Sequence, residues 1–220
     1  MENLSERLKA IYNMVPQGTA ADIGADHGKL IIALFEGGVI SHGYAVENKH
    51  GPYNRLVKAL QDKELIDDIV PLYSDGIKDL PEGVHTVIIA GMGGTLIIDI
   101  LKKYPQKTKQ IQTLIIDAHT CIPKVREEVS KLGFVIADEK MVREDGVFYE
   151  IIKFIRADVA FYGENDLEFG PILRNEKSAL FKEKYEERIS EIDNLLKNPN
   201  LPQGRIDELS SEKKRIQSIL

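Results

Sequence analysis

Short apolar runs alternate with longer amphipathic stretches between residues 19 and 156. This alternation is typical of repeated strand and helix units around a mostly parallel sheet. Because the apolar runs are nearly continuous in Val, Ile and Leu, we expect strands that are buried on both faces. The predicted strands are Thr19–Gly24, Gly43–Glu47, Ile69–Tyr73, Thr86–Ala90, Gln112–Asp117, Phe134–Arg143 and Val147–Arg156. The pattern therefore predicts an α/β fold.

Both ends of this predicted sheet carry further signals. The last two strands are separated by Glu144, Asp145 and Gly146, a turn sequence that predicts an antiparallel hairpin closing the sheet. Ahead of the sheet, residues 4–15 carry apolar side chains at helical spacing, which predicts a helix packed on the sheet. We expect Arg7 on the solvent-facing side of that helix.

The character of the chain changes after Asp158. Two amphipathic stretches are separated by a break rich in Pro, Asn and Gly at 198–204, which predicts an antiparallel helical hairpin similar to a short coiled coil. Lys213 stands where the apolar stripe of the second helix would otherwise continue. We therefore divide the chain into an α/β domain of residues 1–160 and a helical hairpin of residues 161–220.

Composition narrows the class of protein. The 220 residues are 43% hydrophobic and 29% charged, as in an ordinary globular protein. The formal net charge of −6 lowers the expectation of non-specific binding to nucleic acid, which depends on Lys and Arg. A single cysteine, Cys121, excludes an intramolecular disulfide. Since no apolar run approaches the roughly 18 residues of a membrane span and no signal peptide is evident, we expect a cytoplasmic protein without a membrane segment.

The strongest chemical signal is the loop after the first predicted strand. Here Asp22, Gly24, Asp26, His27 and Gly28 lie between a strand and a helix, at the sheet edge where such folds bind ligands. The acidic side chains would repel the pyrophosphate of a dinucleotide. They suit S-adenosylmethionine, which has a sulfonium and an ammonium group and no phosphate. His27 either packs against this cofactor, caps the helix or takes part in catalysis.

Acidic residues also end the next two predicted strands. Glu47 lies 23 residues after Gly24, a spacing at which a carboxylate can accept both ribose hydroxyl protons, and Asn48 follows it. Asp75 and Gly76 form a polar turn where the acid can accept the adenine amino group. The alternative is that these acids cap helices or stabilise turns.

A glycine-rich loop follows the fourth predicted strand. Gly91, Met92, Gly93 and Gly94 leave a narrow floor of exposed backbone, as expected where a flat base lies against the cofactor methyl group. We assign Gly91 to the cofactor, Gly93 and Gly94 to the substrate, and Met92 to packing the reacting ring. A tight strand-to-helix turn is the alternative. The Asn/Asp-Pro-Pro sequence of many exocyclic-amine methyltransferases is absent.

A metal centre is not predicted. Asp117, His119 and Cys121 alternate along the chain, but no second pair completes a four-ligand zinc site. A Cys-His hydrolase is equally unsupported, because Cys121 lacks a nucleophile motif around it.

Taken together, these motifs resemble the bacterial tRNA (adenine-22-N1)-methyltransferase family. The resemblance continues into the C-terminal part and covers nearly the whole chain. The motifs are Arg7-Leu8, Asp22 to Leu30, Glu47 with Gly51-Pro52, Asp75-Gly76, Ala90 to Gly94, Glu144 to Gly146 with Tyr149 to Ile152, Phe169 to Pro171, and Glu176 to Ser178. The resemblance implies a Rossmann-like class I methyltransferase domain, S-adenosylmethionine as cofactor and the D-arm of tRNA as partner.

One departure from the family concerns the substrate side. Asp117 and Ala118 stand where relatives usually carry a Gln-Pro pair after the fifth strand. We expect this extra carboxylate, beside the entering base, to alter substrate choice or weaken activity.

The resulting hypothesis is methyl transfer to N1 of an adenosine in tRNA by a monomer or weak dimer. Asp26 is expected to stabilise the cationic base and then accept a proton from N6. Basic residues flank the predicted cleft and either dock RNA or serve solubility, namely Lys102, Lys103, Lys107, Lys109, Lys124 and Arg126. Two rivals stay open, a methyltransferase for a small molecule and a non-catalytic protein that binds the cofactor or RNA.

Overall fold

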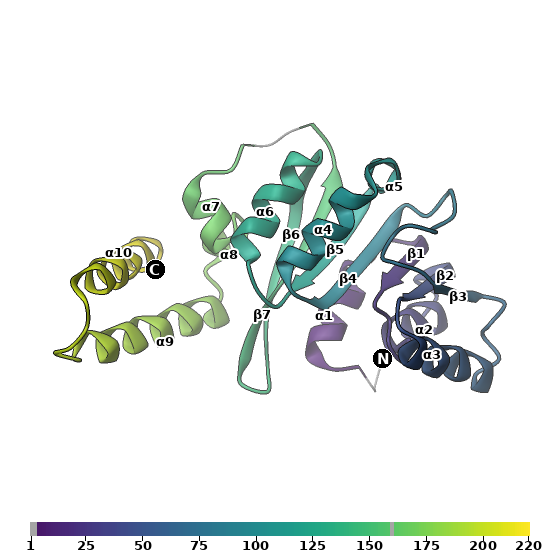
Figure 1. The fold of residues 1–220 in the computed structure, drawn as a ribbon, viewed down its shortest axis with the longest axis horizontal. Helices are drawn as coiled ribbons and strands as arrows, with labels where there is room; N and C mark the ends of the chain where they lie inside the picture. Colours follow the sequence, from purple (N-terminus) through teal and green to yellow (C-terminus); the bar gives the residue numbers. More distant parts are fainter. Residues whose placement is uncertain (1–3, 159–160) are drawn as a thin grey trace. The chain divides into compact units, whose positions relative to one another are not determined.

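One seven-stranded sheet forms the centre of the N-terminal part of the chain (Figure 1). The structure is a computed structural model that describes residues 4–158 and 161–220. The strands are β1 (Gly18–Ile23), β2 (Ile40–Glu47), β3 (Ile69–Tyr73), β4 (Thr86–Met92), β5 (Thr113–Ala118), β6 (Phe134–Glu144) and β7 (Val147–Arg156). Each predicted strand is confirmed. The sheet therefore has the mixed α/β architecture that the apolar pattern predicts.

The strand order is β3-β2-β1-β4-β5-β7-β6. The pairs β1–β2, β1–β4, β2–β3 and β4–β5 are parallel, and β7 is antiparallel to both β5 and β6. The order reverses between β1 and β4, so loops after these strands diverge and leave room for a ligand at the carboxyl edge.

Two strands extend past their predicted ends by more than one residue. β2 begins at Ile40 because this buried residue pairs with Gly18 of β1. β4 runs to Met92, which pairs with Ala118 after an irregularity beyond Ala90. The second extension matters for function, because it carries part of the glycine-rich loop into the sheet.

Within residues 4–158, six helices cover the sheet in two layers (Figure 1). One apolar core contains side chains of α1 (Glu6–Met14), α2 (Lys29–Glu36) and α3 (His50–Asp62). The other contains side chains of α4 (Gly94–Lys103) and α6 (Ile122–Lys131), with α5 (Pro105–Gln110) following α4. Adjacent residues of one strand, such as Ile88 and Ile89, belong to different cores. Both faces are thus buried, which explains the continuous apolar runs.

A charged cluster is buried beneath α6. Arg126 has no exposed side-chain surface, and its Nε donates to Glu139 Oε1 of β6 at 2.8 Å. Its Nη2 donates to Glu150 of β7. The prediction that Arg126 flanks a cleft on the surface is therefore wrong, since its charge is neutralised inside the protein.

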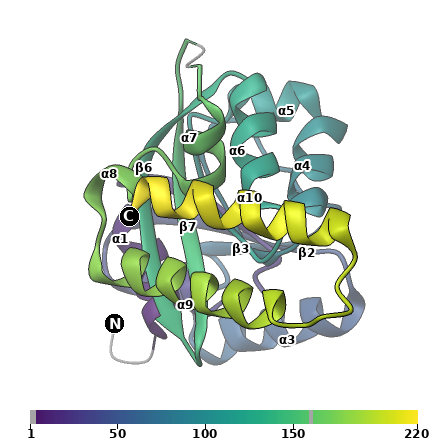
Figure 2. The same ribbon diagram turned by 90° about the vertical axis from the view of Figure 1, so that its left-hand side faces the viewer.

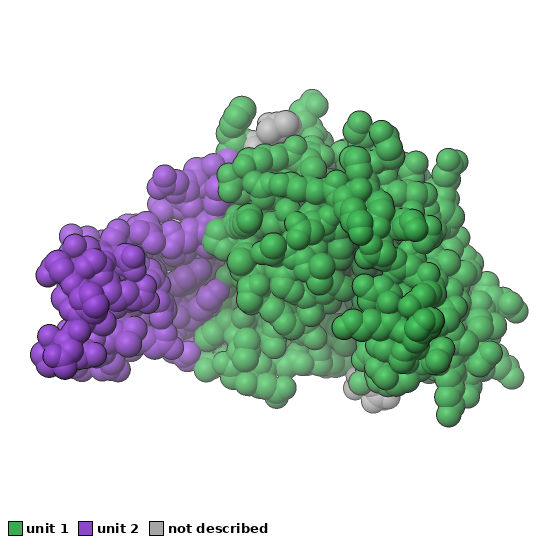
Figure 3. Space-filling model, in the orientation of Figure 1, with its two compact units in different colours: residues 1–161 green, residues 162–220 purple. Residues whose placement is uncertain are grey.

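The chain divides into two compact units, residues 1–161 and residues 162–220 (Figure 3). The second unit contains α7 (Glu164–Phe169), α8 (Leu173–Glu176), α9 (Ala179–Leu196) and α10 (Gln203–Ile219). The two long helices α9 and α10 lie side by side (Figures 1 and 2). Among the residues that the structure describes, no helix is both long and apolar enough to cross a bilayer.

Paired charges link α9 to α10. Arg188 contacts Glu212 through two hydrogen bonds of 2.7 and 3.0 Å, and Lys213 pairs with Asp193. These cross-pairs hold the two helices of the hairpin together. Lys213 thus interrupts the apolar stripe without leaving its charge unpaired.

Candidate functional site

Two adjoining hollows lie at the carboxyl ends of β1, β2, β3 and β4. The larger, here the main cleft, has a volume of about 350 Å³. The smaller, here the side pocket, has a volume of about 200 Å³. Gly24 and Asp26 line both. Among the predicted site residues, the main cleft is also lined by Glu47, Asn48, Asp75, Gly76 and Met92, and the side pocket by Asp22 and His27.

The loop after β1 requires glycine at its first position. Gly24 has φ +77°, and a Cβ at this residue would lie 2.4 Å from Met92 Cε. A side chain there would therefore strain the backbone and displace Met92. Gly28, also with positive φ, is the N-cap of α2. Gly24 thus lets the β1 loop and the end of β4 come into direct contact.

Glu47 organises the β1 loop from the end of β2. Its Oε1 accepts a hydrogen bond of 2.7 Å from the backbone N–H of Asp26. The side chain lies on the wall of the main cleft. A carboxylate in this position can accept hydroxyl protons from a ligand while it holds the neighbouring loop in place.

Asp22 is a buried acid with a strongly shifted pKa. Burial, and to a smaller extent the nearby charge of Glu47, raise the pKa of this carboxyl to about 7. Since Asp22 lines the side pocket, its ionised form would be stabilised by a cationic group of a ligand.

Asp26 differs from Asp22 in being exposed and paired. Its Oδ1 accepts a hydrogen bond of 3.1 Å from Arg55 Nη2 of α3, and its Oδ2 lies 3.6 Å from His27 Nε2. The structure thus brings Asp26 and His27 together at the junction of the two hollows.

Asp75 follows β3 and faces two partners. Its Oδ2 accepts hydrogen bonds from Lys103 Nζ at 2.6 Å and from Tyr104 Oη at 2.8 Å. The hydrogen bonds from Lys103 and then Tyr104 hold the pKa of Asp75 below its usual range. The carboxylate therefore stays ionised at the rim of the main cleft.

Asp117 is fully buried and lines neither hollow. Its Oδ2 lies 2.6 Å from Nη1 of Arg7 on α1, while its Oδ1 has no hydrogen-bond partner within the described ranges. Burial raises the pKa of Asp117, and the Arg7 charge partly offsets this effect. Arg7, expected in solvent, instead lines the side pocket and pairs with Asp117.

The glycine-rich loop packs against the chain that follows β5. Gly94 N–H donates to Thr120 O at 3.1 Å, and a Cβ at Gly94 would lie 2.4 Å from the same oxygen. The backbone of Gly91 and Gly93 lies beside His119 and Thr120. The loop thus forms a wall between β4 and β5, and only its Met92 lines the main cleft.

Several predicted RNA-docking lysines are held by neighbours. Lys102 pairs with Glu128, Lys103 pairs with Asp75, and Lys107 donates to the backbone oxygen of Leu80. Their contacts favour a structural or solubilising role. No group of three or more His, Cys, Asp or Glu side chains capable of holding a metal ion occurs within residues 4–158 and 161–220.

Comparison with known proteins assigns the chain to a family. A family model described as tRNA (adenine(22)-N(1))-methyltransferase matches residues 20–219. The chain belongs to the tRNA (adenine(22)-N(1))-methyltransferase family. It is similar to the tRNA (adenine(22)-N(1))-methyltransferase of Bacillus subtilis, with 29% identity over 199 residues, 84% of this chain and 81% of the relative.

Solved structures extend the similarity to three dimensions. Streptococcus pneumoniae Sp1610, in complex with S-adenosyl-L-methionine, matches with a TM-score of 0.90 and 30% identity, covering 99% of each chain. The B. subtilis m1A22 tRNA methyltransferase matches with a TM-score of 0.85 and 25% identity over 99% of this chain and 98% of that one. The fold of this methyltransferase is therefore a class I methyltransferase fold, as the resemblance implied.

Some residues of this methyltransferase site were missed in the sequence. Arg7 and Arg55 reach the site from α1 and α3, and Leu96 and Ile100 line the main cleft from α4. Each has a helical spacing that fits an ordinary surface or core position. No motif in the sequence points to Arg55 as a site residue, whereas the Arg7-Leu8 motif does point to Arg7.

Proposed function

We propose that the protein transfers a methyl group from S-adenosylmethionine to N1 of adenosine 22 in the D-arm of tRNA. The observation that carries this proposal is the family match over residues 20–219. The main cleft supports it, because its lining has three acids, Asp26, Glu47 and Asp75, against one Lys, and this balance suits a cationic nucleoside. We further propose a cytoplasmic enzyme that acts as a monomer or weak dimer.

The residues present fit the cofactor part by part. Glu47 would accept the ribose hydroxyl protons, and Asn48 and Gly76 lie on the same wall of the main cleft. Asp75 would accept the adenine amino group through Oδ1, since Lys103 and Tyr104 both contact Oδ2. In the side pocket, Asp22 would face the ammonium group. The junction at Gly24 and Asp26 is then where the methyl group would lie.

Bound there, S-adenosylmethionine supplies an electrophilic methyl group on a sulfonium. Adenine N1 carries a free lone pair, so the new N–C bond forms as the C–S bond breaks, and no base is needed beforehand. The protein therefore acts mainly by alignment. Because N1 lies on the Watson–Crick edge, the base must be unpaired or flipped. Met92 and the glycine-rich loop pack the ring, and Asp26 stabilises its positive charge.

The pKa of Asp22 predicts a pH-dependent affinity for S-adenosylmethionine. Only the ionised carboxylate attracts the ammonium group, and the ionised fraction grows as pH rises through about 7. Affinity should therefore increase roughly 8-fold between about pH 6 and pH 7.5. Titration calorimetry at several pH values measures this. Asp22→Asn should bind weakly at every pH without the trend; an unchanged trend in that variant would contradict the assignment.

Asp26→Ala should reduce turnover more than cofactor affinity. Loss of a carboxylate beside the developing cation is expected to lower kcat on the order of 10- to 100-fold. The dissociation constant for S-adenosylmethionine should change little, because Glu47 bonds to the backbone rather than to the side chain of Asp26. Asp62→Ala, at an exposed position ending α3, is the control. Loss of cofactor binding in Asp26→Ala would refute the proposed role.

Methyl incorporation tests the proposed function. The protein is incubated with labelled S-adenosylmethionine and bacterial tRNA lacking the modification, followed by nucleoside mass spectrometry. A gain of 1-methyladenosine supports the proposal. Cofactor binding without incorporation would favour the small-molecule or non-catalytic alternative, and a salt-independent tRNA affinity would argue further against RNA as substrate.

A further inference from the structure

Two aromatic rings lie beside each other where β5 ends. His119 directly follows β5 and is exposed, and its ring centroid lies 5.6 Å from that of Tyr149 on β7, with 64° between the ring planes. The cofactor roles described above use neither residue. We call this pair the His119–Tyr149 platform.

Backbone contacts connect the platform to the junction of the two hollows. His119 N–H donates to Met92 O at 2.9 Å, and Met92 Cε is the atom that a Cβ at Gly24 would meet. The platform is therefore separated from the β1 loop by Met92 alone along this path. A base resting on it would lie on the β4 and β5 side of the junction.

Gly91 lies beside the platform. A Cβ at this residue would lie 3.7 Å from Arg7 Nη1 and 4.0 Å from His119 Nε2. The backbone of Gly91 thus lies beside the Arg7 guanidinium and the His119 ring. Both side chains end in planar groups, which suit contact with a planar ligand.

Arg7 contacts both rings of the platform. Its Nη1 lies 3.3 Å from His119 Nε2, and its guanidinium carbon lies 5.1 Å from the centroid of the Tyr149 ring. Because a guanidinium only donates, Nε2 is the acceptor in this contact. Asp117 balances the Arg7 charge at 2.6 Å.

We propose that the His119–Tyr149 platform receives the target adenine by stacking, with Arg7 and Asp117 as positioning residues. This inference rests on the proposed function and names the acceptor side of the same site. The Arg7–Asp117 pair is balanced in charge, so it does not repel a base that becomes cationic on methylation. The role of Asp117 is then to hold Arg7, without touching the base.

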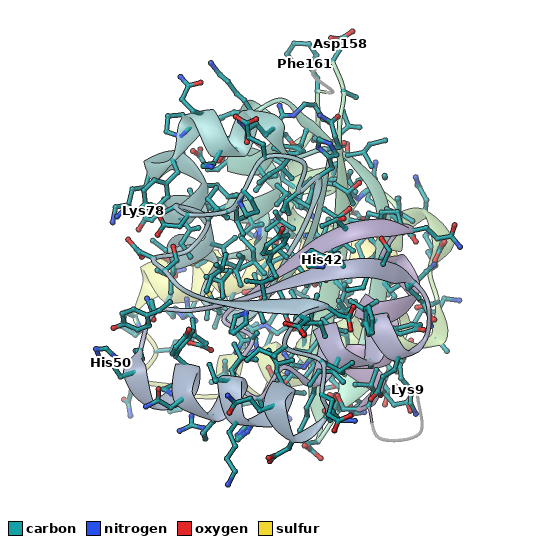
Figure 4. The ribbon with its side chains drawn as sticks, turned by 90° about the vertical axis from the view of Figure 1, so that its right-hand side faces the viewer. Lys9, His42, His50, Lys78, Asp158 and Phe161 are labelled. Carbon is teal, nitrogen blue, oxygen red and sulfur yellow. The ribbon has the colours of Figure 1, made fainter. Side chains whose placement is uncertain are left out.

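His119→Ala tests the platform against a matched control. Stacking on an aromatic side chain contributes enough that kcat/KM for tRNA should fall about 10- to 100-fold, with weaker tRNA binding. The dissociation constant for S-adenosylmethionine should stay within about twofold. The control is His42→Ala. His42, labelled in Figure 4, lies edge-on to Tyr44 at 5.0 Å near the start of β2, whereas the platform lies where β5 ends. The His42→Ala variant should behave as wild type.

His119→Phe separates stacking from a purely structural role. It keeps a flat ring and removes the bond to Arg7, so it should recover most of the tRNA affinity that His119→Ala loses. The proposal is overturned if His119→Ala methylates and binds tRNA like wild type. It is also overturned if His119→Ala loses as much affinity for the cofactor as for tRNA, or if His119→Phe is as impaired as His119→Ala. If the wild type itself transfers no methyl group to tRNA, the proposed function fails; an active wild type with an equally active His119→Ala defeats the platform alone.

Discussion

Arg126→Met should lower the free energy of unfolding by about 3 to 5 kcal/mol, the largest stability effect that we expect from one substitution. The guanidinium is fully buried between Glu139 and Glu150. Removing it leaves two buried carboxylates without the guanidinium that pairs with both. Chemical denaturation monitored by circular dichroism measures the loss.

A partly exposed arginine provides the control. Arg188 also pairs with two acids, Glu191 and Glu212, but about a third of its side chain is exposed to water. Arg188→Met should therefore cost less than about 1 kcal/mol. The variant Arg126→Met with Glu139→Gln and Glu150→Gln should regain part of the stability, because it buries no unpaired charge. Equal costs for Arg126→Met and Arg188→Met would contradict the buried-charge argument.

Glu47→Ala should weaken S-adenosylmethionine binding on the order of 100-fold, since hydrogen bonds to a charged group contribute roughly 1.5 to 3 kcal/mol each. Two interactions disappear together. The ribose loses its acceptor, and the Asp26 N–H loses the carboxylate that holds the β1 loop at 2.7 Å. Titration calorimetry with purified protein measures the affinity.

Glu47→Gln and Glu36→Ala complete this test. The side-chain amide oxygen introduced by Glu47→Gln would still accept from the Asp26 N–H, so the affinity of this variant should fall between those of wild type and Glu47→Ala. Glu36 is an exposed acid at the end of α2 that pairs with Lys63, and its loss should leave cofactor binding unchanged. An affinity of Glu47→Ala within about threefold of wild type would show that the main cleft does not take the ribose.

The strands were predictable because a strand that is buried on both faces is apolar at nearly every position, and this run is visible in the strand's own sequence. Ile88 and Ile89 point into different cores, so both are apolar, and the run in β4 can be read without its neighbours. The acids at strand ends were predictable for a related reason: parallel strands bring their carboxyl ends to one edge. Asp22, Glu47 and Asp75, distant in sequence, line adjoining hollows accordingly.

The missed contacts depend on pairings between distant elements. Arg126 lies in a charged, amphipathic stretch, and only the β6–β7 hairpin beneath α6 supplies the two carboxylates that let it be buried. Arg7 and Asp117 also pair between distant elements, and they are 110 residues apart along the chain. No local spacing encodes such a pair. The extension of β4 to Met92 was also missed, because three nearby glycines resemble a turn and only pairing with Ala118 makes the segment a strand.

The most direct test of the account uses one tRNA transcript in two forms, with adenosine or guanosine at position 22. Each is incubated with the wild-type protein and S-adenosylmethionine, and the modified nucleoside is identified and located by mass spectrometry. We predict 1-methyladenosine at position 22 of the adenosine transcript and no methyl transfer to the guanosine transcript. Equal methylation of both transcripts, or none of either by protein that binds the cofactor, would contradict the proposed function.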